Sequence, residues 1–318
     1  MIRHRSVGLV GVLPVYLALA TALGFVDFRV RTHHERDLAY TASVVAGTEE
    51  PPGRYRILAP YAFDGLTRLT RLAPGDAWFL FRWLCLFATL LAGHLYFRTW
   101  FEIGPAFAGN LLIAALLPLT FTNAWAHPDH LMELFLFTMA CACLARGWNW
   151  GFAAALVLNA LNRETSAFLV LLYSLARPID RRHAGWSAGL AALWLMISMA
   201  LRWRLGFASY NPWQARQNLE FLALLPAAYD PYYRVFAWFV ALLIAPLLWL
   251  IARTWPIQTR LSKVAAAIVT PAFLLVAFLF SSIIETRIFT PLLPLLIPGA
   301  LTALFPHRSS TEIGRAHV

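Results

Sequence analysis

Long runs of apolar residues alternate along the chain with short polar segments, and this alternation is its strongest pattern. Most of the runs are long enough for an α-helix to cross the hydrocarbon core of a bilayer, which takes roughly 17–25 residues. The predicted fold is therefore an all-α, polytopic membrane helix bundle that forms a single domain over 1–305. Its predicted spans are 7–26, 78–97, 103–122, 131–145, 185–201, 234–252, 264–281 and 288–305.

The segment 150–176 departs from this pattern. It holds two apolar stretches of about 13 residues, each about 20 Å long as a helix and too short to span alone. The stretches are separated by "LNRET", 161–165, in which Arg163 and Glu164 stand side by side. We predict a short helical hairpin here, which gives about ten membrane-entering helices in total.

The two ends of the chain need separate treatment. Small residues at Ala20 and Ala22 allow the first apolar run to be read as a signal peptide, but its length favours a retained helix. Residues 306–318 are predicted to be a cytoplasmic tail. The last six of these, "IGRAHV", resemble a translated sequencing artefact.

Composition and charge agree with a membrane protein. The chain is 60% hydrophobic and only 13% charged, which is atypical of a water-soluble domain. Its net charge of +10 comes from basic residues in short loops, so it indicates membrane topology and not nucleic-acid binding. These loops all lie on one side of the membrane only if the hairpin 150–176 makes its turn on the opposite side. The side with the basic loops and both termini is predicted to be cytoplasmic. The basic loops contain Arg98, Arg146, 177–183, 253–263 and Arg308.

Acidic residues gather on the other, outer side. The first outer loop, 27–77, contains three candidate acids, Asp27, Glu35 and Asp37, and one candidate cation, Arg56. Its stretches 34–47 and 55–72 have apolar residues on one helical face, which predicts two interfacial amphipathic helices. A solvated connecting loop is the plainer alternative.

Three later outer segments carry further candidates. His127, Asp129 and His130 can bind a metal ion or act as a general base, but Asp129 can equally cap the helix that follows it. Arg163 can bind a phosphate bidentately with Glu164 orienting it; alternatively, the pair neutralises itself and only closes the hairpin. Glu285 and Arg287 lie before the last span. They are interpreted either as part of the polar site or as an anchor at the membrane interface.

Five stretches together give the chain its resemblance to a known family. They are Asp27 after the first span, "GRYRILAP" at 53–60, "HPDHLMELFLF" at 127–137, "LNRET" at 161–165 and "ETRIFTPLLPLL" at 285–296. In these stretches, and in hydropathy over most of 1–305, the chain resembles the type C membrane glycosyltransferases (GT-C fold), among bacterial branches related to lipid-linked-sugar mannosyl- and arabinosyltransferases. The resemblance implies sugar transfer from a polyprenyl-phosphate donor to an envelope lipid, glycan or protein, outside the bacterial inner membrane.

The resemblance also implies roles for individual residues. An acid in the first outer loop is the expected catalytic base: Asp27, or else Glu35 or Asp37, since the usual adjacent acids are absent here. Arg56, Arg163 and Arg287 are the expected phosphate-binding cations. His127, Asp129, His130, Glu164 and Glu285 complete the expected substrate site, with the polyprenyl-phosphate sugar and membrane lipids as partners. A divalent metal ion is left open as a cofactor.

Two other classes of function remain open on the sequence alone. A transporter or lipid flippase also places charges within apolar helices, but it predicts inverted repeats with matching broken helices in both halves. Only one broken pair, at 150–176, is visible. A non-catalytic membrane component would use the same charges as structural contacts. Gly-rich phosphate loops and the Gly-x-Ser-x-Gly and His-Glu-x-x-His motifs are absent from the sequence.

Overall fold

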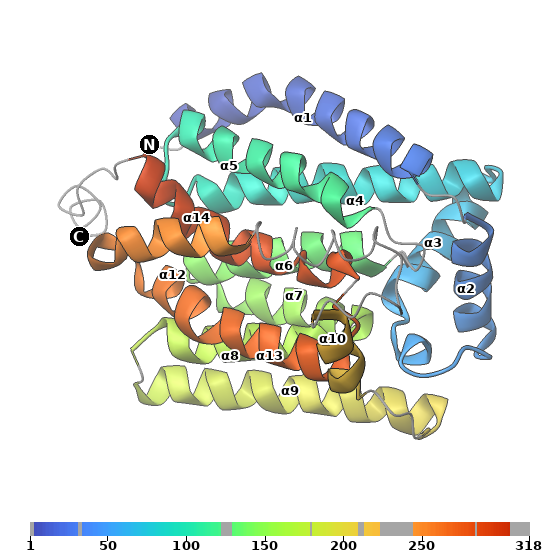
Figure 1. Cartoon of the computed structure of the whole chain (residues 1–318). Coiled ribbons are helices and arrows are strands. Elements are labelled where there is room, and N and C mark those ends of the chain that lie inside the picture. Colours follow the sequence, from blue (N-terminus) through green and yellow to red (C-terminus); the bar gives the residue numbers. More distant parts are fainter. Residues whose placement is uncertain are drawn as a thin grey trace.

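The structure, a computed structural model, describes residues 3–30, 34–121, 129–178, 180–208, 213–222, 244–283 and 285–305. These residues form helices and turns, and no strand occurs among them (Figure 1). The predicted all-α bundle is confirmed for this part of the chain.

The helices follow the predicted order along the chain. The first group contains α1 (Arg3–Val30), α2 (His34–Ala46), α3 (Leu58–Thr70), α4 (Pro74–Phe97), α5 (Ile103–Leu116), α6 (Asp129–Ala145) and α7 (Asn149–Asn162). The second contains α8 (Ala167–Ala176), α9 (Arg181–Leu205), α10 (Ala215–Leu222), α12 (Arg260–Val264), α13 (Thr270–Phe280) and α14 (Leu292–Leu304). A further apolar helix, Ile244–Arg253, precedes α12, and a π-helical turn, Ala265–Val269, joins α12 to α13.

Five helical stretches are long and apolar enough to cross a membrane. They are Val10–Val30, Pro74–Phe97, Ile103–Thr120, Arg181–Leu205 and Arg260–Phe280. Shorter apolar helices occupy Glu164–Ala176, Ile244–Arg253 and Leu292–Leu304. The chain therefore has the character of a membrane protein. The sequence predicts a larger number of membrane-entering helices. That number includes α6 and α7, which are too short to count as membrane spans by length alone. It also includes the segment 234–252, which the structure describes only from residue 244.

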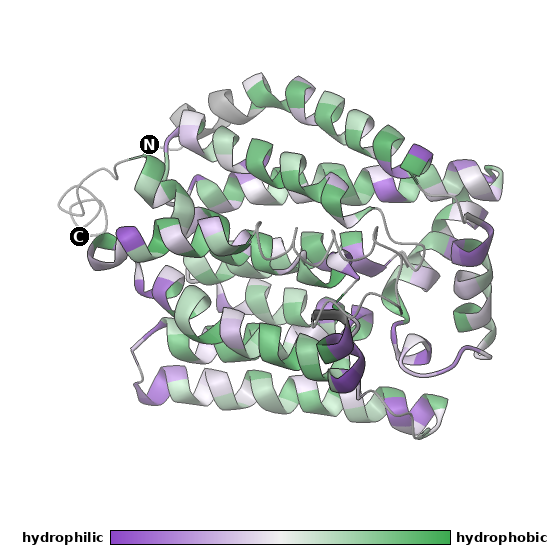
Figure 2. Cartoon of the chain, in the orientation of Figure 1, coloured by the Kyte–Doolittle hydropathy of each residue, from purple (hydrophilic) through white to green (hydrophobic). Residues whose placement is uncertain are grey.

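α6 is the central helix of the bundle. It packs against α4 and α7, and α1 packs on the far side of α4 (Figure 1). Most of its residues are buried, because it is apolar on nearly all sides and so needs neighbours all round. Figure 2 shows the same apolar character on most of the surrounding helices.

The predicted hairpin at 150–176 is present. α7 ends at Asn162, Arg163 adopts an extended backbone, and α8 begins at Ala167. After α8, Arg177 Nη2 donates a hydrogen bond of 2.8 Å to the carbonyl of Leu144 near the end of α6. The turn between α7 and α8 therefore lies at the opposite end of the bundle, where α6 begins.

The predicted first outer loop, 27–77, forms two helices close to the predicted stretches. α2 and α3 pack on each other, and α3 also contacts α4, α6 and α7, so the pair lies against the end of the bundle where α6 begins (Figure 1). α3 ends at Arg71, whose φ of 55° is left-handed, and α4 starts with Pro74 in its first turn. These breaks hold the loop folded back on the bundle.

A small polar group joins three of the apolar helices inside the bundle. The Tyr16 hydroxyl on α1 lies 2.8 Å from Nδ1 of His94 on α4. Nδ2 of Asn110 on α5 donates a hydrogen bond of 2.8 Å to the same hydroxyl. Asn110 Nδ2 also donates 2.9 Å to the carbonyl of Leu90. Interhelical hydrogen bonds of this kind fix how apolar helices pack in a membrane.

Gly93 makes the close approach of α4 and α5 possible, and this generates a prediction. A Cβ atom at position 93 would collide with Oδ1 of Asn110. We expect Gly93→Ala to destabilise the protein by about 1–3 kcal/mol, because the Asn110 amide is buried and held by two hydrogen bonds. Gly65→Ala on α3 is the control: its Cβ meets nothing within 4 Å. Thermal unfolding in detergent measures both, and equal transition temperatures for the two variants would contradict the packing described.

Candidate functional site

Charged side chains from three segments meet at the end of the bundle where α6 begins. Arg163 is at the centre: its Nη1 lies 2.7 Å from Oε2 of Glu133, and its Nε lies 3.3 Å from Oδ2 of Asp129. Asp129 and Glu133 are four residues apart and therefore share one face of α6. The guanidinium of Arg163 thus spans the first turn of the central helix.

Arg56 brings the first outer loop to the same place. Its Nη1 lies 3.4 Å from Oδ2 of Asp129, and its Nε lies 3.4 Å from Oε2 of Glu164. We call Arg56, Asp129, Glu133, Arg163 and Glu164 the ion network. Within it, Arg163 and Glu164 find their ionic partners on other segments, so the adjacent pair does more than neutralise itself.

The ion network runs from the protein interior to its surface. The side chains of Asp129 and Glu133 are fully buried and that of Arg163 is 5% exposed, whereas Arg56 is 15% and Glu164 31% exposed. A buried charge is tolerated only when it is paired and hydrogen-bonded. We call the buried Asp129, Glu133 and Arg163 the floor of the network and the partly exposed Arg56 and Glu164 its rim.

Hydrogen bonds explain why the hairpin turns at this point. Asn162 Nδ2 donates 2.8 Å to the backbone carbonyl of Asp129, and the Thr165 hydroxyl donates to Oε1 of Glu133. Residues on both sides of Arg163 are thus tied to the first turn of α6. The backbone leaves the helical conformation after Asn162, and the turn between α7 and α8 packs on the start of α6.

Two groups outside the membrane-spanning helices have shifted pKa values. Burial acts to lower the pKa of Arg56, but the carboxylates of Glu164 and Asp129 outweigh it and raise the pKa above its usual value. Burial, reinforced by the Asp129 carboxylate, raises the pKa of Tyr40 above its usual value. Near neutral pH, Arg56 is therefore charged and Tyr40 is protonated, which removes the Tyr40 phenol from the candidate bases.

A second buried ion pair adjoins the ion network. Nη2 of Arg82 on α4 lies 2.7 Å from Oδ1 of Asp27 on α1, and its Nε also bonds the Asp27 carboxylate. Both side chains are 2% exposed. The same Nη2 lies 3.5 Å from Nε2 of His130, the neighbour of Asp129. The predicted base Asp27 is thus held bidentately by an arginine.

The other predicted residues lie in different settings. Asp37 is buried in the first turn of α2, while Glu35 on the same helix is exposed. Glu285 and Arg287 pair with each other before α14, with 2.7 Å between Oε2 and Nη2. Neighbouring Thr286 donates a hydrogen bond to the carbonyl of Leu119. His127 lies outside the described residues.

Sequence reasoning missed Arg82, and it gave no role to Glu133 or Thr165. Arg82 stands alone within the apolar run 78–97, and a charge in such a position usually faces a bundle interior. That signal was available. Thr165 gave no comparable signal, because a hydroxyl near a helix break has many ordinary uses.

The residues that the structure describes offer no group of three or more His, Cys, Asp or Glu side chains able to hold a metal ion. The ion network itself contains three carboxylates and two guanidinium groups, each carboxylate paired with at least one arginine.

The Asp27–Arg82 pair generates a stability prediction. Asp27→Asn should destabilise the protein by about 3–5 kcal/mol, because it leaves the buried Arg82 charge without its carboxylate. The double variant Asp27→Leu with Arg82→Met should recover most of that loss, since both charges are then removed. Chemical unfolding in detergent of this double variant and of the single variants Asp27→Leu and Arg82→Met gives a double-mutant cycle. Additive effects of the single changes would show that the two side chains do not stabilise each other.

Comparison of the chain with models of protein families, with curated proteins and with solved structures gave no match.

Proposed function

We propose that the protein is a membrane glycosyltransferase of the GT-C type. It would move a sugar from a polyprenyl-phosphate donor to a lipid, glycan or protein of the cell envelope, on the outer side of a bacterial inner membrane. The ion network carries the proposal. Four residues that the sequence singled out, Arg56, Asp129, Arg163 and Glu164, meet at one end of an apolar helical bundle.

The exposed rim suits donor binding better than the floor does. Both ion pairs of Arg56 are 3.4 Å long, and its side chain is partly exposed. The pair between Arg163 and Glu133 is 2.7 Å long and buried. Moving the Arg56 guanidinium from Glu164 to a phosphate therefore costs less free energy than separating Arg163 from Glu133. Arg56 is the proposed phosphate ligand, and Arg163 holds Asp129 in position beside it.

The transfer needs a base as well as a cation. A carboxylate takes the proton of the acceptor hydroxyl, the hydroxyl oxygen bonds to the sugar C1, and the bond from C1 to the phosphate oxygen breaks. Asp27, Asp37 and Glu35 remain the proposed bases by resemblance. Glu164 is an additional candidate, because its Oε1 is buried without a hydrogen-bond partner among the described residues while Oε2 faces Arg56.

Arg56→Gln tests the phosphate role. Loss of a charge-assisted hydrogen bond should raise the KM for the donor about 10- to 100-fold, with a smaller effect on kcat. The assay uses purified protein in lipid and a panel of polyprenyl-phosphate hexoses and pentoses. Arg68→Gln is the matched control, because Arg68 is a mostly exposed arginine on neighbouring α3. Equal KM values for the two variants would remove Arg56 from the site.

Glu164→Gln separates two roles for the rim carboxylate. If Glu164 is the base, kcat should fall by about 100-fold or more, since general base catalysis typically contributes that much. If Glu164 only competes with phosphate for Arg56, the donor KM should fall and kcat should hold. The split between KM and kcat decides between these roles.

The same preparation distinguishes an enzyme from a flippase. In vesicles loaded with labelled polyprenyl-phosphate sugar, a transferase cleaves the bond between sugar and phosphate when acceptor lipids and glycans from a cell envelope are present. A flippase moves the intact lipid between leaflets. Movement without cleavage across the whole donor panel would replace the proposed function with the second one.

A further inference from the structure

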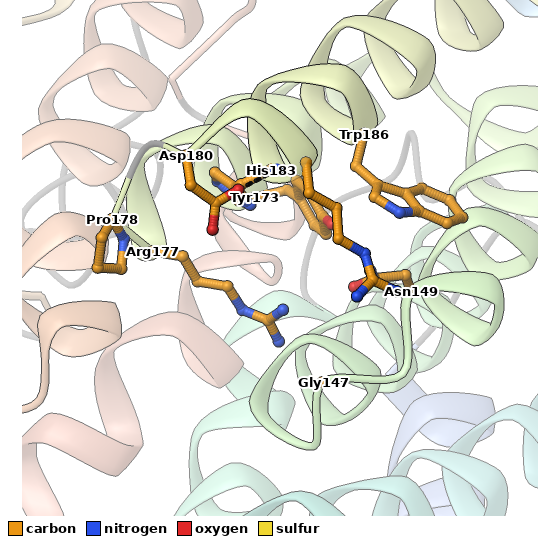
Figure 3. A pocket seen from close by; sticks show the side chains of 9 residues that line it. Gly147, Asn149, Tyr173, Arg177, Pro178, Asp180, His183 and Trp186 are labelled. Atoms are coloured by element: carbon orange, nitrogen blue, oxygen red, sulfur yellow. Dashed lines mark hydrogen bonds between the residues drawn. The ribbon is translucent and has the colours of Figure 1, made fainter.

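A cavity of about 330 Å³ lies at the opposite end of the bundle from the ion network. It opens between the turn that joins α6 to α7 and the turn that joins α8 to α9. Figure 3 shows Asn149, Tyr173, Arg177 and His183 around it, and Arg182 also belongs to its lining. Because α6 has 17 residues, the cavity and the ion network are separated by about 25 Å along the bundle.

The walls of this cavity are held by hydrogen bonds. Arg177 is fixed through Nη2 to the carbonyl of Leu144. The Asp180 side chain caps α9 by accepting a hydrogen bond of 2.7 Å from the backbone N–H of His183. The His183 ring lies 3.2 Å from the carbonyl of Ser174 through Nε2 and stacks on Tyr173 with 5.0 Å between ring centroids. The lining is therefore arranged before any ligand arrives.

The hydroxyl oxygen of Tyr173 is a polar atom in the lining of the cavity. Tyr173 is 1% exposed, and its hydroxyl makes no hydrogen bond within the described part of the chain. It lies within electrostatic range of both Arg177 and Arg182. A buried hydroxyl left unpaired costs free energy, so a ligand oxygen at this position would satisfy it.

The charge of the lining favours an anion. The lining contains two guanidinium groups, those of Arg177 and Arg182, and one carboxylate, that of Asp180. One oxygen of that carboxylate accepts the capping hydrogen bond of α9. Arg260 also lies at this end, because its Nε donates 3.1 Å to the carbonyl of Leu175 at the end of α8. The Asn149 amide adds a further donor to the lining.

We propose that this cavity binds a phosphate group, supplied by the headgroup of an anionic phospholipid or by free phosphate. Donors from both turns line the cavity, and recognition of a multi-oxygen anion requires several donors. The end of the bundle with the basic loops is where an anionic leaflet would present such headgroups. The proposal is independent of the sugar-transfer site, because the two lie at opposite ends.

Native mass spectrometry of the delipidated full chain, titrated with phosphatidylglycerol or phosphatidylcholine, tests the proposal. We expect phosphatidylglycerol to bind about tenfold more tightly, since only it carries a net negative headgroup. Arg182→Gln should weaken that binding about tenfold, and Tyr173→Phe, which removes one oxygen atom, about fivefold. Arg181→Gln is the control: Arg181 is exposed beside Arg182 but is not part of the lining.

A second arm uses inorganic phosphate against chloride at equal ionic strength. Competition between phosphate and phosphatidylglycerol, sensitive to Tyr173→Phe, supports a shared phosphate site with lipid as a source. Phosphate binding without preference between the two lipids assigns the site to free phosphate. The proposal is overturned if neither probe binds, or if Arg181→Gln weakens binding as much as Arg182→Gln.

Discussion

The structure depends on one electrostatic constraint: a charge inside an apolar bundle has to meet an opposite charge. Arg163 satisfies it by reaching Asp129 and Glu133 on the central helix. To do so, the chain must leave the helical conformation after Asn162. The same requirement brings Arg56 and its loop back over the end of the bundle. The hairpin turn, the start of α6 and the folded first loop are thus consequences of one set of ion pairs.

These pairs become longer and more exposed from the interior towards the surface. Glu133 and Arg163 are buried and close together, so changing either one threatens the fold. Arg56 and Glu164 are partly exposed and their contact is longer, so they are free to exchange partners. The proposed enzyme would use both, since a rigid floor would position the groups and a looser rim would admit the substrate.

The opposite end of the bundle is built on a different principle. Two of its arginines bind backbone carbonyls, Arg177 that of Leu144 and Arg260 that of Leu175, and these bonds hold the guanidinium groups in place without neutralising them. Within the ion network, by contrast, each charge is paired with its opposite. The two ends therefore suit different ligands, although they are joined by the same short helices.

The sequence by itself determined the helical class, the order of the helices and the break at 161–165, because these depend on local hydropathy and on the cost of charge in an apolar run. It also identified four of the five residues of the ion network. The tertiary structure alone decided their partners. Arg163 and Glu133 are 30 residues apart, and Arg56 and Glu164 are 108 apart. Whether Arg163 and Glu164 bind each other or other segments follows from how helices pack, and hydropathy carries no information about that distance.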